Sequence, residues 1–243
     1  MSPMENLAIV LVLCTTLSII SYKLRLLTLS GSVASFVMGV VIGTFGSINW
    51  LLLLIAFALV GFVVTRVKLE SKMERGLQEG RKGERTWKNV VANGLLPAIV
   101  AVVAWALGVS DTVDAGVVYL TAISVAASDT IASELGVLSD KAKLITTMKD
   151  VPAGTDGGVS VMGTIWAFLG AMFASFLGWA VIFPGMWPDW RLAIPIVVGF
   201  LGCNIDSLIG ATLERKGKIS KLGTNIASMA AGTALAALIV VLL

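Results

Sequence analysis

The stretch N49-W-L-L-L-L-I-A-F-A-L-V-G-F-V-V-T-R66 contains no charged residue before Arg66. A helix of about 20 apolar residues is long enough to cross a bilayer, so we expect this stretch to span a membrane. Similar windows recur on both sides of it, and we predict spans near residues 5–22, 29–47, 49–66, 88–108, 115–138, 157–183, 191–213 and 223–243. The composition agrees, with 57% hydrophobic and 14% charged residues and a mean hydropathy of +0.93. The sequence therefore predicts an all-α, polytopic membrane helix bundle of about eight transmembrane helices, in a single domain covering residues 1–243.

The basic residues lie in alternate loops, after the first, third, fifth and seventh predicted spans. They are Lys23, Arg25, Arg66, Lys68, Lys72, Arg75, Arg81, Lys82, Arg85, Lys88, Lys141, Lys143, Lys149, Arg215, Lys216, Lys218 and Lys221. Only Arg191 lies on the opposite side. Because translocation disfavours Lys and Arg, we expect these loops in the cytoplasm, both termini outside, and a multi-pass protein of the cell membrane. The charged segment 67–88 is predicted to be a cytoplasmic basic loop or an amphipathic helix on the membrane surface.

The inventory of metal-binding and nucleophilic side chains is narrow. The chain has no histidine, which excludes histidine catalysis and histidine metal ligands. Cys14 and Cys203 both fall within predicted spans, with no other Cys nearby in sequence, so neither a disulfide framework nor a thiolate metal site is indicated. Any metal ion must then be a hard cation held by oxygen, and we expect Mg²⁺.

Three aspartates lie inside or at the mouth of apolar segments, where an isolated carboxylate is costly and usually functional. Their surroundings are A126-A-S-D-T-I-A-S-E-L-G136, G154-T-D-G-G-V-S160 and C203-N-I-D-S-L-I-G-A-T212. We expect Asp129, Asp156 and Asp206 to share one polar site. Glu134 lies about 140° around an unbroken helix from Asp129 and would join them only if the helix unwinds. The alternative is that these polar side chains only form hydrogen bonds between helices.

The stretch K149-D-V-P-A-G-T-D-G-G-V-S160 is predicted to be a loop that runs into the start of a helix. Backbone amides in such a loop can converge on a phosphate, and the helix dipole favours the same charge. Asp156 fits such a site if a divalent cation bridges the carboxylate and the phosphate. The alternative is that an Asp or Thr of this stretch is an ordinary N-cap, with the glycines as turn residues. The spacing is not that of a Walker A loop.

Four motifs in order resemble the signatures of one membrane family. They are R81-K-G-E-R-T-W-K-N-V-V-A-N-G94, A127-S-D-T-I-A-S-E-L-G136, G154-T-D-G-G-V-S160 and D206-S-L-I-G-A-T212. This is the uncharacterised-domain family that contains the plant and cyanobacterial phytyl-phosphate kinases, and the likeness extends from about residue 30 to the C-terminus. The resemblance implies transfer of a phosphoryl group from a nucleoside triphosphate, with CTP as the expected donor, to an isoprenoid monophosphate such as phytyl or geranylgeranyl phosphate.

A phosphotransferase mainly positions two anions and neutralises charge on the migrating group. Under this hypothesis Asp129, Asp156 and Asp206 are the catalytic and Mg²⁺-binding residues, and Glu134 is a further metal candidate. The expected nucleotide- and phosphate-binding residues are Arg81, Lys82, Arg85, Asn93, Lys149, Gly154, Thr155, Gly157, Gly158, Ser160, Asn204 and Asn225. The alternative for the basic loop residues is that they only set the orientation of the chain in the membrane and attract lipid headgroups.

Other classes of function stay open. A secondary transporter also places carboxylates and broken helices around a membrane cavity, although the polar motifs here cluster in the cytoplasmic halves of the spans. The 149–160 loop faintly resembles that of the CDP-diacylglycerol synthases, with Thr155 and Asp156 in place of a histidine, so a CDP-lipid cytidylyltransferase is a further alternative. A purely structural subunit leaves the three acids unexplained. The expected partners are a nucleoside triphosphate, an isoprenoid monophosphate and membrane lipid, with no nucleic acid; a homodimer stays open.

Overall fold

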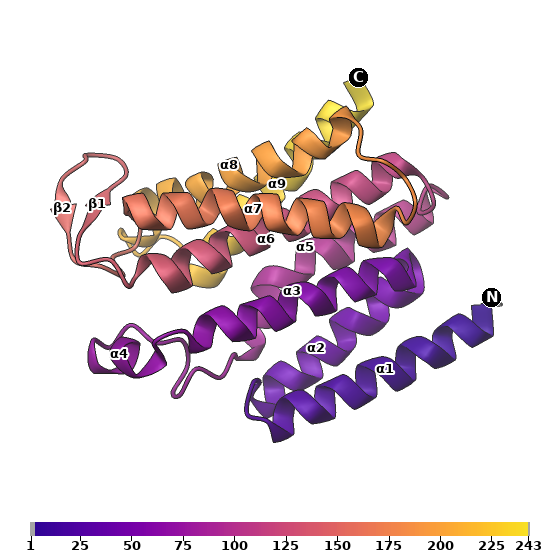
Figure 1. Cartoon of the computed structure of the whole chain (residues 1–243), viewed down its shortest axis with the longest axis horizontal. Helices are drawn as coiled ribbons and strands as arrows, with labels where there is room; N and C mark the ends of the chain where they lie inside the picture. The colour runs from indigo at the N-terminus through magenta and orange to yellow at the C-terminus, as the bar shows by residue number, and fades with distance from the viewer. Residues whose placement is uncertain (1–2, 243) are drawn as a thin grey trace.

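The computed structural model describes residues 3–242, which form a bundle of long helices (Figure 1). Eight helices in this part of the chain are long and apolar enough to cross a membrane. They are α1 (Pro3–Lys23), α2 (Leu29–Val41) continued by the π-turn η1 (Ile42–Gly46), α3 (Ile48–Arg66), α5 (Trp87–Ala106), α6 (Val113–Gly136), α7 (Val161–Ile182), α8 (Ala193–Ile209) between η2 (Trp190–Leu192) and η3 (Gly210–Glu214), and α9 (Lys221–Leu242). The predicted all-α, multi-pass membrane bundle is confirmed.

Helix α6 is the centre of the bundle and packs against α3, α5, α7, α8 and α9. In an apolar stretch of 18 residues of α6, 78% of the residues are buried, compared with 11% in the corresponding stretch of α1 at the edge of the bundle. Small residues allow the close approach: a Cβ at Gly199 of α8 would collide with Ser124. The hydroxyls of Ser124 and Ser128 donate to the carbonyls of Pro195 and Ala167, both at 2.8 Å. Several serines of α6 are thus interhelical contacts, as the alternative explanation expected.

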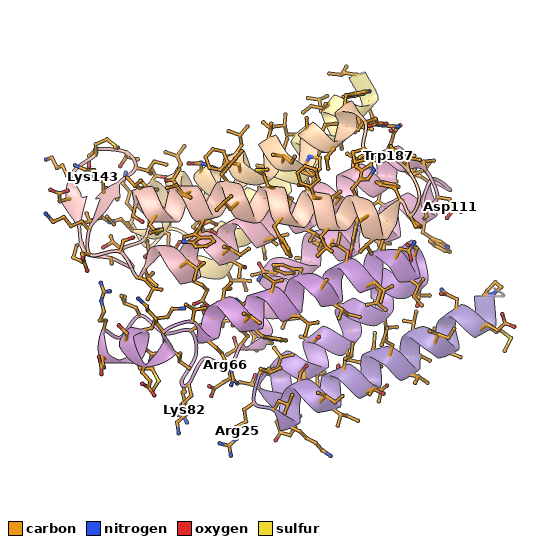
Figure 2. All side chains as sticks on the ribbon, viewed as in Figure 1. Arg25, Arg66, Lys82, Asp111, Lys143 and Trp187 are labelled. Carbon is orange, nitrogen blue, oxygen red and sulfur yellow. The ribbon has the colours of Figure 1, made fainter. Side chains whose placement is uncertain are left out.

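The two ends of the bundle differ in charge (Figure 2). Arg25, Arg66, Lys82 and Lys143 lie at one end, which we call the basic end, while Asp111 and Trp187 lie at the other. Helix α1 begins and α9 ends at this second end (Figure 1). The basic loops that the sequence predicts on one side of the membrane therefore lie at one end of the structure.

Arg191 is the single exception to that alternation. Its guanidinium donates to Asp189 at 2.6 Å and to Asp114 at 3.1 Å. The hydrogen bond from Arg191 holds the pKa of Asp189 below its usual range. Two carboxylates thus surround the one basic side chain of the described residues at this second end of the bundle, which we call the acidic end.

The predicted sixth span starts too early. Helix α7 begins at Val161 because the preceding residues form a small antiparallel sheet, in which β1 (Ala142–Leu144) lies between β2 (Asp150–Val151) and β3 (Gly158–Val159). The glycine-rich stretch is therefore fastened on both sides by strands. In the described segment between α3 and α5 only α4 (Leu69–Glu74) is helical. Its Lys72 is buried within the protein, whereas a helix lying on the membrane surface would expose this lysine to lipid headgroups.

Candidate functional site

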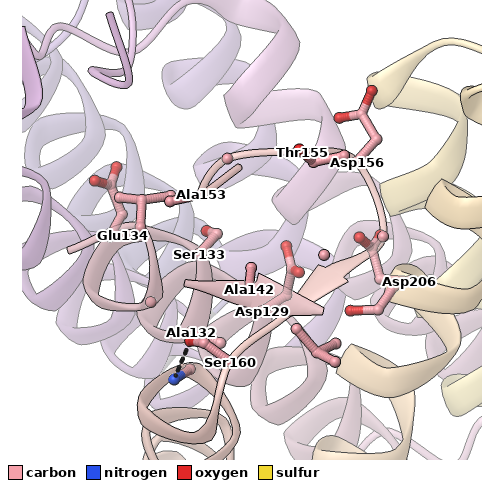
Figure 3. Close-up of a pocket in the computed structure, with 18 of the residues that line it drawn as sticks. Asp129, Ala132, Ser133, Glu134, Ala142, Ala153, Thr155, Asp156, Ser160 and Asp206 are labelled. Atoms are coloured by element: carbon pink, nitrogen blue, oxygen red, sulfur yellow. Dashed lines mark hydrogen bonds between the residues drawn. The ribbon is translucent and has the colours of Figure 1, made fainter. Parts of the chain in front are cut away.

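A cavity of about 370 Å³ lies at the basic end, where α6, α7, α8 and α9 meet the loop before α7 (Figure 3). We call it the loop cavity. Its charged lining residues are Glu79, Asp129, Glu134, Asp156, Asp206 and Lys221. The three aspartates predicted to share a site thus line the same cavity. The carboxylate of Asp156 points away from the other two, and this residue is exposed (Figure 3).

The first turns of α9 hold the two deeper aspartates. Asp206 is 4% exposed; its Oδ1 accepts a hydrogen bond from Ser228 Oγ at 3.1 Å, and its Oδ2 lies 3.7 Å from Lys221 Nζ. The carboxylate of Asp129 accepts a single hydrogen bond from the described residues, from Asn225 at 3.5 Å. Both acids therefore retain oxygen lone pairs that no protein group occupies.

The loop from Ala153 to Ser160 forms one wall of the loop cavity. Gly154 and Gly157 have φ angles of +81° and +72°, in the left-handed region that favours glycine. A Cβ at Gly157 would collide with the backbone of Ala211, so the loop lies directly against the π-turn that ends α8. The turns of the loop use the amides of Thr155 and Gly158, whereas the amides of Asp156 and Gly157 donate to no described residue.

Ser160 is the N-cap of α7 and accepts from the amide of Gly163 at 3.0 Å. Its hydroxyl also accepts from Ser139 at 3.1 Å. The N-cap of this helix is therefore a serine, whereas the alternative drawn from the sequence was an Asp or Thr cap. Gly158 also lies at the cavity, but its amide is used within the loop, by Thr155 at 2.8 Å.

A second cavity of about 230 Å³ lies on the other side of Asp129, between α5, α6 and α9. We call it the arginine cavity. Its polar lining comes from Glu79, Arg85, Thr86, Lys88, Asn89, Asn93, Asp129, Thr130, Ser133, Glu134, Lys221 and Asn225. Glu79, Asp129, Ser133, Glu134 and Lys221 line both cavities, so they form a shared wall.

Glu134 lines both cavities but is engaged by partners from other elements. Lys72 of α4 donates to its Oε2 at 2.7 Å, and Thr65 of α3 donates to its Oε1 at 2.7 Å. Arg85 lies 3.7 Å from the same carboxylate. Figure 3 shows Glu134 directed away from Asp129 and Asp206. Glu134 is thus the centre of a buried ion-pair network, at a distance from the two aspartates.

The four basic residues that the sequence predicts to bind phosphate differ in burial and in their position relative to the cavities. Arg81, Lys82 and Lys149 are exposed and line neither cavity. Arg85 is 8% exposed, lines the arginine cavity, and donates to Thr65 Oγ1 at 3.0 Å. Burial lowers the pKa of Arg85, while the carboxylate of Glu134 acts in the opposite direction.

The three predicted asparagines divide between the cavities. Asn204 lines the loop cavity and donates to the carbonyl of Phe200 at 2.8 Å. Asn93 and Asn225 line the arginine cavity. Lys221, which lines both, was not among the predicted site residues, because in the sequence it is one more lysine of a basic loop.

The carboxylates of the loop cavity meet some of the requirements of a magnesium site. No group of three or more Cys, Asp or Glu side chains within residues 3–242 has the spacing of a metal centre. Mg²⁺, however, is commonly held by one or two carboxylates together with water and substrate phosphates. Asp129 and Asp206 supply two carboxylates to one cavity, so these two residues would hold the ion.

Comparison with known proteins places this geometry in a family. The model of the family "Integral membrane protein DUF92" matches residues 12–237. The chain is 34% identical over 237 residues to the uncharacterized membrane protein MJ0933 of Methanocaldococcus jannaschii, covering 95% of this chain and 92% of that protein. It is 31% identical over 238 residues to Protein PGR of Arabidopsis thaliana, covering 89% and 82%. It is 28% identical over 209 residues to the chloroplastic Protein VTE6 of the same plant, covering 84% and 61%. No solved structure matches the chain.

Proposed function

We propose that this chain, which belongs to the DUF92 family of integral membrane proteins, transfers a phosphoryl group from a nucleoside triphosphate to an isoprenoid monophosphate. The family match confirms the membership inferred from the four sequence motifs. The kinase activity is carried over from the phytyl-phosphate kinases that those motifs resemble. The geometry of the loop cavity supports the same class of reaction.

One observation carries the proposal: two aspartates with unused lone pairs, a lysine and a loop with unbonded amides line a single cavity at the basic end. Acids alone would repel a phosphate, and cations alone would bind it without a place for a metal ion. The combination is what a site for a metal-bound triphosphate requires. The volume of about 370 Å³ falls in the usual range of ligand pockets.

In the proposed reaction an oxygen of the isoprenoid monophosphate attacks the γ-phosphorus of the triphosphate. The bond from that phosphorus to the β,γ-bridging oxygen breaks, so that isoprenoid diphosphate and nucleoside diphosphate are the products. Because the nucleophile is already an anionic oxygen, no strong general base is needed. The site has to orient the two phosphates and stabilise charge.

The residues divide these tasks. The amides of Asp156 and Gly157 bind oxygens of the triphosphate, and Lys221 binds oxygens near the transferred phosphoryl group. Asp129 and Asp206 would hold Mg²⁺. A bound Mg²⁺ ion supplies charge neutralisation on the phosphoryl oxygens. Helix α9 orients both acids through Ser228 and Asn225.

The test uses the full chain purified in detergent with Mg²⁺, radiolabelled nucleoside triphosphates, and phytyl or geranylgeranyl monophosphate. We expect the isoprenoid diphosphate and a nucleoside diphosphate in equal amounts, with CTP as the most effective donor. Pyrophosphate with a CDP-lipid would show a cytidylyltransferase. Absence of turnover with every donor and both acceptors would reject the kinase.

A further inference from the structure

We infer that the arginine cavity is a separate binding site for the phosphate head of the isoprenoid acceptor, so that donor and acceptor occupy different cavities and meet at Asp129 and Lys221. This inference rests on the proposed function and adds to it the position and chemistry of the second substrate. It rests on an unpartnered polar atom, on charge balance, and on the shared wall.

The first observation is a buried donor without a partner. Arg85 is 8% exposed and lines the arginine cavity, yet its Nε is enclosed without a hydrogen-bond partner among residues 3–242. Buried polar groups are nearly always paired, and a guanidinium is costly to leave unsatisfied. Phosphate oxygens are the acceptors that guanidinium N–H groups bind best. An anionic head in this cavity would be attracted by the positive charge of the Arg85 guanidinium.

The charged residues that line the loop cavity are mainly acids, whereas acids and basic residues are equal in number in the arginine cavity. In the loop cavity Lys221 is the sole basic residue among five acids. The arginine cavity has three basic residues, Arg85, Lys88 and Lys221, against three acids; Glu134 is paired with Lys72 and lies 3.7 Å from Arg85. The loop cavity therefore suits a triphosphate neutralised by a divalent cation. The arginine cavity suits a phosphate that arrives without one.

Size and position agree with a headgroup. The arginine cavity measures about 230 Å³, below the roughly 300–1,000 Å³ usual for sites that hold whole drug-sized ligands. It lies beside Thr86 and Lys88 at the start of α5, and Trp87 between them is 43% exposed. Tryptophans of this kind lie at the level of lipid headgroups. An isoprenoid phosphate could thus place its head in the cavity while its tail stays in the membrane.

The shared wall explains how the two substrates reach each other. Asp129 and Lys221 line both cavities, and Lys221 Nζ lies 3.7 Å from Asp206. A γ-phosphate at the edge of the loop cavity and an acceptor phosphate at the edge of the arginine cavity would both contact Lys221. The lysine then holds two anions together, which is the main task of this class of catalyst.

The test uses a matched pair of isosteric substitutions. Asn93→Leu removes an amide that lines only the arginine cavity, and Asn204→Leu removes one that lines only the loop cavity. We expect Asn93→Leu to raise the KM for geranylgeranyl monophosphate on the order of tenfold with little change in the KM for CTP. Asn204→Leu should do the reverse. If Asn93→Leu raises only the KM for CTP, or both variants raise the same KM, the assignment is wrong.

A binding measurement separates this inference from the proposed reaction. Radiolabelled geranylgeranyl monophosphate should bind the wild type and Asn204→Leu, bind Asn93→Leu about tenfold more weakly, and not be displaced by saturating CTP. Binding with this pattern but without turnover would reject the kinase and keep the lipid-phosphate site. Displacement by CTP, or no binding to the wild type, would overturn the two-cavity inference even if turnover is observed.

Discussion

Asp129 and Glu134 lie five positions apart on the same helix, and their surroundings differ completely. Glu134 is bonded by Lys72 and Thr65, both at 2.7 Å, with Arg85 close by. Within residues 3–242 Asp129 has one hydrogen bond, of 3.5 Å from Asn225, and this acid lines two cavities. An acid with a full set of partners contributes to the fold, whereas an acid with open lone pairs beside a cavity is available to a ligand. The region around Glu134 is thus a structural joint, and the region around Asp129 is the proposed reaction site.

The largest expected effect is on activity. Asp129→Asn keeps the shape of the side chain and removes its charge, so we expect turnover to fall by about 10³-fold, the usual range for loss of a group that stabilises transition-state charge. The thermal unfolding temperature in detergent should stay within a few degrees of the wild type. Asp206→Asn should behave in the same way.

Asp114→Asn is the control, because Asp114 lies at the acidic end, in a contact with Arg191 that is distant from both cavities. It should retain wild-type turnover. Wild-type turnover in Asp129→Asn and Asp206→Asn would remove the reaction site from this cavity.

The second prediction tests the structural joint. Glu134→Gln leaves Lys72, which is 1% exposed, as a buried cation without a counter-charge, so we expect a loss of about 3–5 kcal/mol in the free energy of unfolding. The double variant Glu134→Gln with Lys72→Met removes both charges of this pair and should recover part of this loss, because Arg85, 3.7 Å from Glu134, still lacks its counter-charge. Denaturant titration of the purified protein gives both values. A single variant as stable as the wild type would mean that the ion pair is not what joins α4 to α6.

The third prediction concerns the backbone of the loop cavity. Gly157 and Gly108 have similar φ angles, +72° and +70°, but a Cβ at Gly157 meets the backbone of Ala211, whereas a Cβ at Gly108 meets nothing within 4 Å. Both alanine variants therefore carry the same conformational strain, of order 1 kcal/mol. We expect Gly157→Ala to lower kcat/KM for the nucleotide on the order of 10- to 100-fold and Gly108→Ala to leave it unchanged. Equal effects on activity would show that the loop does not contact the triphosphate.

The contrast between the two acids also shows how far the sequence could be interpreted. The spans could be predicted because hydropathy is a property of a whole window, and errors of a few residues do not change it. Asp129 and Asp206 could be predicted because carboxylates in apolar segments are rare and costly. The three short strands around the glycine-rich loop could not, because two or three residues carry no recognisable periodicity.

The basic residues that pair with the acids could not be predicted from the sequence, for a different reason. Lys72 is 62 positions from Glu134, and in the sequence it is one of many basic residues in a cytoplasmic loop. The same is true of Lys221, which the sequence gives no reason to separate from Lys216 and Lys218. Topology places all of them at one end, and only the packing of α4 and α9 selects those that reach the acids.

The smallest expected effect separates topology from chemistry among the basic residues. Arg81, Lys82 and Lys149 are exposed and line neither cavity, so we expect the glutamine variant of each to change turnover by less than about twofold, as is usual for exposed charges. Lys221→Gln makes the same chemical change at a residue that lines both cavities, and should lower turnover by about 10- to 100-fold. Assays at low and high salt sharpen the difference, because salt screens the exposed charges more strongly than the enclosed one. If Lys82→Gln impairs turnover as much as Lys221→Gln at high salt, the segment before α5 must close onto the substrates, and the basic end would be a moving part of the site.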